Sequence, residues 1–146
     1  YQQCLEIKQE LGDRNGVASL LLNLGLLDQA ISDYNSARKF YQQSLQIKQE
    51  LGDKSGVAGS LHHLGMLDQA SGDYDAAFKH YKHSLKIFEE MGDKSGMASS
   101  LHQQGMLDQT IGNYDSARKL YQNSLKIFDE IGDLSLIHIS EPTRPY

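Results

Sequence analysis

The sequence contains one cysteine, Cys4, no tryptophan, and only two prolines, both within the segment 134–146. A single cysteine excludes an intrachain disulfide and favours a reducing compartment, so a cytoplasmic location is expected. No hydrophobic run approaches the ~20 residues needed to span a bilayer, so no membrane contact is expected. The net charge of −5 argues against nucleic-acid binding, because phosphates require a concentrated basic surface.

An initiator methionine is also absent, since the chain begins YQQCLEIK in a pattern typical of the middle of a helix. We therefore expect the natural N-terminus, with any targeting segment, to precede Tyr1. The cytoplasmic location is accordingly an expectation from cysteine usage alone.

Sequence signatures of catalysis and of metal binding are missing as well. GxSxG, HExxH and Cys–His motifs do not occur, so the sequence predicts neither an enzyme nor a bound cofactor. His62 and His63 are adjacent, and adjacent side chains on a helix point about 100° apart. His80 and His83 have suitable spacing, but no third ligand accompanies them. No metal site is expected.

The sequence does contain an internal repeat with a period of 40 residues. The pentapeptide GDKSG occurs at Gly52 and again at Gly92, and the related GDRNG begins at Gly12. The units 52–91 and 92–131 are identical at 26 of 40 positions, far more than chance allows. A fixed period of this length is typical of stacked supersecondary units. The full repeats are 12–51, 52–91 and 92–131, and residues 1–11 match the end of a preceding repeat.

Each unit carries two amphipathic helical patterns. Hydrophobic residues recur at steps of three and four in GVAGSLHHLGMLDQA and in YDAAFKHYKHSLKIFEEM, and neither segment shows strand alternation. Gly52 follows the apolar end of a second helix, where a left-handed cap favours glycine. Asp53 comes next and is suited to cap the following helix. GDKSG is therefore predicted to end one helix and to start the next.

The chain resembles the tetratricopeptide repeat family, in its variety with about 40 residues per unit. In the second unit the resemblance rests on Leu61, Leu64, Gly65, Gly72, Tyr74, Ala77, Tyr81 and Leu85. It implies an all-α fold, an α-solenoid of stacked antiparallel helix pairs over residues 1–133. The small residues Gly65 and Ala77 are expected to let the paired helices approach closely, with tyrosines filling the space beside them.

Three positions depart from the repeat pattern. Gln104 replaces the leucine of Leu24 and Leu64, which places an amide in the expected core. Ser32 replaces the glycine between the two helices of a unit. Cys4 stands where the other units have serine, which favours a small, buried and inert thiol. We expect a looser first and third unit, with the fold retained.

Residues 134–146 share nothing with the repeat. The string LSLIHISEPTR resembles the conceptual translation of a transposase-type sequencing adapter. We expect this segment to be an artefact of sequence assembly, and otherwise a divergent or disordered tail, so His138 and Arg144 are assigned no role.

The family architecture places the first helix of each unit along a concave groove that binds partners. Three positions per unit, one helical turn apart, are expected to line it: Leu22, Leu26, Gln29, His62, Met66, Gln69, His102, Met106 and Gln109. Such residues offer adaptable apolar contact and hydrogen bonds to a peptide. An equally weighted alternative places Met66 and Met106 in the core.

Some members of the family grip the C-terminal carboxylate of a partner with lysine, asparagine and arginine on these helices. The corresponding positions in this chain hold no cation: Leu22, Leu26, His63, Ser99 and Gln103. The sequence therefore argues against a carboxylate clamp.

These observations predict a protein-interaction scaffold, cut from a longer array, that binds a protein or peptide partner in its groove. The alternative is a sensor or regulatory segment of a larger signalling NTPase or protease, which flanking sequence would reveal. Because both ends of the array lack polar caps, self-association through the ends is also expected.

Overall fold

The computed structural model describes residues 3 and 13–143, with side chains for residue 3 and residues 13–132. The described backbone forms six helices and no strand: α2 (Arg14–Ala30), α3 (Tyr34–Leu51), α4 (Lys54–Ala70), α5 (Tyr74–Met91), α6 (Lys94–Thr110) and α7 (Tyr114–Thr143). The predicted all-α fold with two helices per repeat is therefore confirmed. Cys4 and Gly12 lie outside the described residues.

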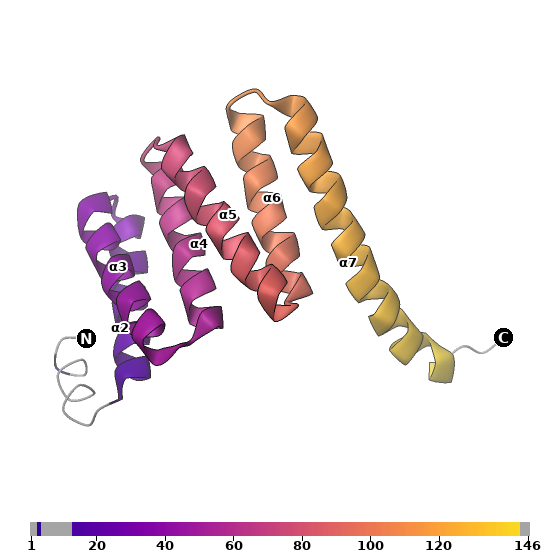
Figure 1. Ribbon diagram of the computed structural model, residues 1–146, viewed down its shortest axis with the longest axis horizontal. Coiled ribbons are helices and arrows are strands. Elements are labelled where there is room, and N and C mark those ends of the chain that lie inside the picture. The colour runs from indigo at the N-terminus through magenta and orange to yellow at the C-terminus, as the bar shows by residue number, and fades with distance from the viewer. Residues whose placement is uncertain (1–2, 4–12, 144–146) are drawn as a thin grey trace. The chain divides into compact units, whose positions relative to one another are not determined.

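The chain divides into two compact units, Tyr1–Ile87 and Phe88–Tyr146. In the first unit α2 packs against α3, and α3 packs against α4; in the second, α6 packs against α7. Within each repeat the two helices run antiparallel and are joined by a short turn (Figure 1). Consecutive packing of helix pairs is the arrangement that the repeat predicts.

The turns between repeats have the predicted chemistry. Gly52 adopts a left-handed conformation with φ 70°, as does Gly92 with φ 71°. Asp53 then accepts a hydrogen bond from the backbone N–H of Gly56 at 2.9 Å, which caps α4. Asp93 caps α6 in the same way, through the N–H of Gly96 at 3.0 Å. GDKSG therefore ends one helix and starts the next, because only glycine adopts positive φ without steric cost.

The turns within a repeat show one departure. Gly72 and Gly112 have φ values of 88° and 90°, and Ser32 takes the corresponding left-handed conformation with φ 66°. A residue with a Cβ atom is strained in this conformation, so the turn within the first repeat is less stable than a glycine turn would be.

Close approach of paired helices depends on three glycines. A Cβ atom added to Gly25, Gly65 or Gly105 would lie 2.5, 2.6 or 2.7 Å from Cε1 of the facing tyrosine: Tyr41, Tyr81 and Tyr121 respectively. Real Cβ atoms essentially never lie that close to a ring carbon. The prediction that small residues let the paired helices approach, with a tyrosine ring filling the space beside them, is therefore confirmed.

The core follows from this packing. In the first unit Ala37, Tyr41, Leu64 and Leu67 form a buried cluster that joins α3 to α4. In the second unit Gln104 is only 4% exposed, so the predicted amide in the core is confirmed. Its Nε2 atom has no hydrogen-bond partner among the described residues.

Helix α7 continues beyond the repeat, from Tyr114 to Thr143. Gly132 corresponds to Gly52 and Gly92 but does not share their positive φ. The sequence that follows Asp133 is LSL and not KSG, so no new helix start follows this glycine. That residues 134–146 are an assembly artefact stays a prediction about the gene.

Candidate functional site

The positions predicted to line a groove lie on α2, α4 and α6. The middle member of each triplet is exposed, with Leu26 at 40%, Met66 at 36% and Met106 at 39%. Both methionines therefore lie at the surface, which does not support their alternative assignment to the core. The role of the nine residues in binding stays a prediction.

The third member of each triplet is a glutamine that is already engaged within its own repeat. The hydroxyl of Tyr41 donates to Gln29 Oε1 at 2.7 Å, and that of Tyr81 donates to Gln69 Oε1 at 3.0 Å. Tyr121 and Gln109 repeat the contact at 2.7 Å. Burial raises the pKa of Tyr81, with a second contribution from the charge of Asp68, so the hydroxyl stays a donor.

Histidine rings of the first helices lie against these tyrosines. The ring of His62 is 5.7 Å from that of Tyr81, and the ring of His63 stacks on Tyr41 at 5.7 Å. Burial lowers the pKa of His62, with a second contribution from His63, and burial likewise lowers the pKa of His63. Both imidazoles are therefore neutral at pH 7 and present hydrogen-bonding groups without charge.

A hollow of about 170 Å³ lies among α2, α3 and α4 in the first unit. It is lined by Ala18, Ser19, Leu22, Ser44, Lys48, Gly56, Gly59, Ser60 and His63. Ser44 donates its hydroxyl hydrogen to the Ala18 carbonyl at 2.9 Å, so this buried polar pair is satisfied. A Cβ atom at Gly59 would meet nothing within 4 Å, so the hollow is open beside that residue.

Of the nine predicted groove residues, only Leu22 lines this hollow. Sequence reasoning missed Ser19 and Gly59, which lie one helical turn before Leu22 and His63 respectively. The sequence does contain a signal for this hollow, because in both repeats a small residue lies one helical turn before a bulkier residue. Sequence reasoning had considered His63 only as a metal ligand and as a clamp position.

The second unit has a separate hollow of about 420 Å³, lined by Met106, Gln109, Thr110 and Tyr114. Two predicted groove residues, Met106 and Gln109, therefore share one surface. The third, His102, instead lies with its ring 5.8 Å from that of Tyr121.

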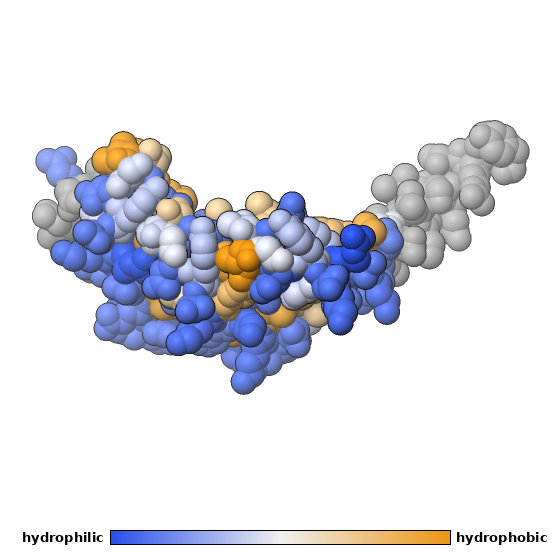
Figure 2. Space-filling model, turned by 90° about the horizontal axis from the view of Figure 1, so that it is seen from above, coloured by the Kyte–Doolittle hydropathy of each residue, from blue (hydrophilic) through white to orange (hydrophobic). Residues whose placement is uncertain are grey.

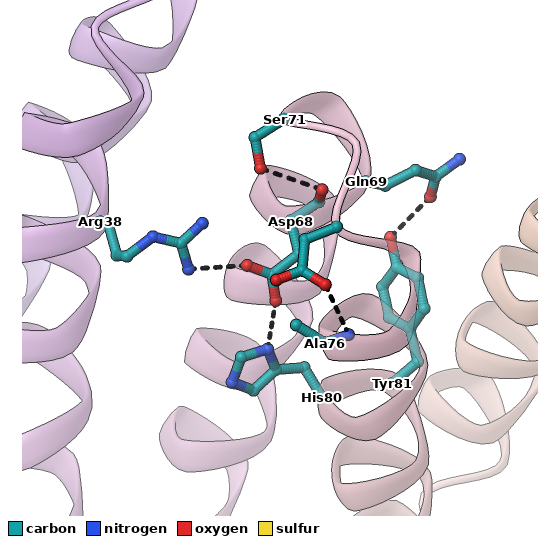
Figure 3. A network of polar contacts seen from close by, with 8 residues as sticks. Arg38, Asp68, Gln69, Ser71, Ala76, His80 and Tyr81 are labelled. Carbon is teal, nitrogen blue, oxygen red and sulfur yellow. Dashed lines mark hydrogen bonds and ion pairs between the residues drawn. The ribbon is translucent and has the colours of Figure 1, made fainter.

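A buried carboxylate is the principal feature that sequence reasoning did not single out. Asp68 is 1% exposed at its side chain and bonds to Arg38 of α3 at 2.6 Å (Figure 3). His80 of α5 places Nδ1 at 2.5 Å from the second carboxylate oxygen. The network thus ties three helices of the first unit together.

The corresponding aspartates in the other repeats use a different partner. Asp28 accepts from Ser36 Oγ and Asp108 accepts from Ser116 Oγ, both at 2.5 Å. The second repeat has Ala76 at that position, so arginine and histidine take the place of the serine. The signal in the sequence was the recurrence of the tripeptide LDQ in all three units.

Other candidate chemistry finds little geometric support. The rings of His62 and His63 are 6.1 Å apart and roughly perpendicular. No group of three His, Cys, Asp or Glu side chains suited to a metal occurs among the described residues. Over the same part of the chain, no helix is long and apolar enough to cross a bilayer. The face in Figure 2 is mainly hydrophilic with separate apolar patches.

A Tetratricopeptide repeat family model matches residues 1–50 and 56–130. The chain therefore belongs to the tetratricopeptide repeat family, a class of helical-repeat scaffolds for protein interaction. No curated protein matches the sequence significantly.

Two solved structures are similar in fold. BtubC (BKLC) from P. vanneervenii superposes with a TM-score of 0.79 at 21% identity, over 90% of this chain and 55% of that one. A Rap protein complexed with Competence and Sporulation Factor gives a TM-score of 0.82 at 19% identity, over 90% of this chain and 37% of that one. The chain thus spans about half of the first protein and less of the second.

Proposed function

We propose that this chain binds an uncharged peptide segment of a partner protein, with an apolar side chain of the peptide seated in the hollow among α2, α3 and α4. The observation that carries the proposal is the composition of that hollow. Leu22 and His63 form part of its walls, and small residues leave it open. Lys48, which also lines the hollow, has its charge paired with Asp53 at 3.2 Å. A neutral imidazole and an aliphatic side chain favour apolar occupants over anionic ones.

Neighbouring groups on the same helices supply the remaining contacts. Leu26 and Met66 are exposed and apolar, which suits an adaptable contact along the peptide. Gln69 has its Oε1 fixed by Tyr81, which orients the amide so that Nε2 is available to a peptide carbonyl (Figure 3). The rigid tyrosine–glutamine pair reduces the entropy lost when the peptide binds.

The absence of cations at Leu22, Leu26 and His63 favours an internal segment over a free C-terminus. A terminal carboxylate would be desolvated without a partner at these positions, which costs binding free energy. The Rap neighbour, which shares the fold, was solved in complex with Competence and Sporulation Factor, and this supports the proposal that the present chain also binds a partner.

The test uses the full chain as bait for a phage-displayed library of random peptides. Selected peptides are expected to share an apolar anchor and to lack a required acidic terminus. Gly59→Phe fills the hollow without a backbone clash, because nothing lies within 4 Å of the added Cβ atom. It should weaken binding of a selected peptide by at least about tenfold, equivalent to about 1.4 kcal/mol.

Gly59→Ala is the matched control, since it makes the same change in backbone freedom but leaves most of the hollow empty. It should bind the selected peptide with nearly unchanged affinity. Equal affinity for Gly59→Phe and the original chain would exclude the hollow as the binding site. Loss of binding by both variants would point to helix geometry instead.

A further inference from the structure

The outer face of α7 is apolar, exposed and hollowed. Tyr114 is 68% exposed, and Leu125 is 61% exposed. A hollow of about 390 Å³ lies on this face, lined in part by Tyr114, Ala117, Arg118 and Tyr121. An apolar face of this kind marks a contact with another polypeptide.

The repeat itself shows what fits such a face. The residues of α3 that correspond to Tyr114, Ala117, Arg118 and Tyr121 are Tyr34, Ala37, Arg38 and Tyr41. On α3 these residues are covered by α4. Leu64 and Leu67 join the apolar cluster with Ala37 and Tyr41, and Asp68 binds Arg38. A helix with leucine, leucine and aspartate at those three positions is therefore the complementary surface.

Helix α2 has that surface. The residues of α2 that correspond to Leu64, Leu67 and Asp68 are Leu24, Leu27 and Asp28, which are identical in type. Leu67 is fully buried beneath α3, whereas Leu27 is 53% exposed. The chain thus carries both halves of the α3–α4 contact on two different helices, and Asp28 also accepts a hydrogen bond from Ser36 Oγ at 2.5 Å.

The arginine makes the match selective. Helix α5 has Phe78 at the position of Arg38, whereas α7 has Arg118. The face of α7 therefore carries the cation found on α3, which α5 lacks. An aspartate that faces Arg118 restores the ion pair, and Asp28 is the residue in register.

We propose that α7 of one copy of this chain packs against α2 of a second copy, head to tail, in the register that α3 uses on α4. Leu27 of the second copy fills the hollow on α7, and Asp28 meets Arg118. Such a contact is heterologous, because it leaves one face of each copy free to bind a further copy.

The test is sedimentation velocity on the full chain over a range of concentrations, with two variants that each block one face. Arg118→Glu places two carboxylates against each other, and Leu27→Glu puts a charge in the hollow. Both residues are exposed, so the fold should persist, which far-UV circular dichroism checks. The original chain should form dimers and longer species, and each variant alone should weaken association by about tenfold or more.

An equal mixture of the two variants is the decisive sample. One variant retains an intact α7 face and the other an intact α2 face, so a dimer with one copy of each should form and should not grow further. If Leu27→Glu alone still associates while Arg118→Glu does not, the contact joins two α7 helices and the proposal is wrong. An original chain that stays monomeric at high concentration would overturn it as well.

Matched controls change the same charge at sites that the register leaves exposed. Lys119 is exposed, as are its equivalents Lys39 and Lys79, and Ala30 is exposed, as is its equivalent Ala70. Lys119→Glu and Ala30→Glu should associate like the original chain, and a loss in either would overturn the register. Gly59→Phe should also leave association unchanged, which separates this contact from the peptide site.

Discussion

Arg38 on α3 binds Asp68 on α4 through a contact of 2.6 Å, in which the carboxylate is 1% exposed and the guanidinium side chain 33%. The pair joins two successive repeats, because α3 is the second helix of the first repeat and α4 is the first helix of the second repeat. A buried carboxylate is costly unless its oxygens are paired, so the fold depends on the partners that Asp68 finds.

Arg38→Leu is expected to lower the free energy of unfolding by about 3 kcal/mol, because it leaves the buried carboxylate with His80 alone on its side chain. Urea denaturation followed by circular dichroism measures the change. Lys39→Leu removes an exposed cation from the next position and should change stability by less than about 0.5 kcal/mol.

A second substitution tests the cause of that loss. Ser36 and Ser116 donate to the aspartates of the other two repeats, and the second repeat has Ala76 instead. Adding Ala76→Ser to Arg38→Leu should therefore recover about 1 kcal/mol. If the serine recovers nothing, the loss arises from packing of the arginine stem and not from the unpaired carboxylate.

Gln104→Leu is expected to stabilise the chain. The amide nitrogen of Gln104 is buried without a partner among the described residues, and Leu64 occupies the corresponding position in the second repeat. Removing an unsatisfied donor and adding apolar burial should raise the free energy of unfolding by about 1–2 kcal/mol. Gln122→Leu, on an exposed position of α7, should show no such gain in the same urea titration. A destabilised Gln104→Leu variant would mean that the amide bonds to an ordered water molecule.

Ser32→Gly should also stabilise the chain, for a reason that lies in the backbone. Ser32 has φ 66°, whereas the equivalent residues Gly72 and Gly112 are glycines at φ 88° and 90°. Relief of the left-handed strain is expected to raise the free energy of unfolding by about 1 kcal/mol. Ser71→Gly is the control, because Ser71 has φ −88° and donates to the Asp68 carbonyl. That variant should lose stability, and a gain at both positions would refute the argument from φ.

The repeat period and its glycines were enough to predict the fold. Gly52 and Asp53 mark the junction between repeats because positive φ and helix capping depend on residues adjacent in sequence. Gly65 predicts a close approach to Tyr81 since both recur at a fixed interval. Local geometry of this kind is readable from a sequence.

The surface hollows and the side-chain contacts between helices were harder to predict. The hollow beside Gly59 depends on which side chains leave space unfilled, and this is a property of packing among three helices. The Arg38–Asp68 pair was missed for a related reason, since no motif singles out Asp68 and its partners Arg38 and His80 lie on two other helices. Long-range pairs of this kind require the helix arrangement before they can be recognised.

Stability should fall as the pH drops below about 6.5, because of His62 and His63. Burial lowers the pKa of each imidazole in the folded chain, and the charge of His63 lowers that of His62 further. The unfolded chain therefore binds protons at a higher pH than the folded chain. The contribution of the two histidines is complete above the unfolded pKa and is lost as the pH falls from there towards the folded values.

The groups that face these imidazoles are Tyr41 on α3 and Tyr81 on α5, both protonated and neutral near pH 6. No carboxylate in these ring contacts offsets the cost of protonation. The double variant His62→Gln/His63→Gln should therefore flatten the dependence of unfolding free energy on pH between about 5 and 7. His83→Gln, at an exposed position, should leave the slope in place. Equal slopes for the double variant and the original chain would mean that other groups control the acid sensitivity of the fold.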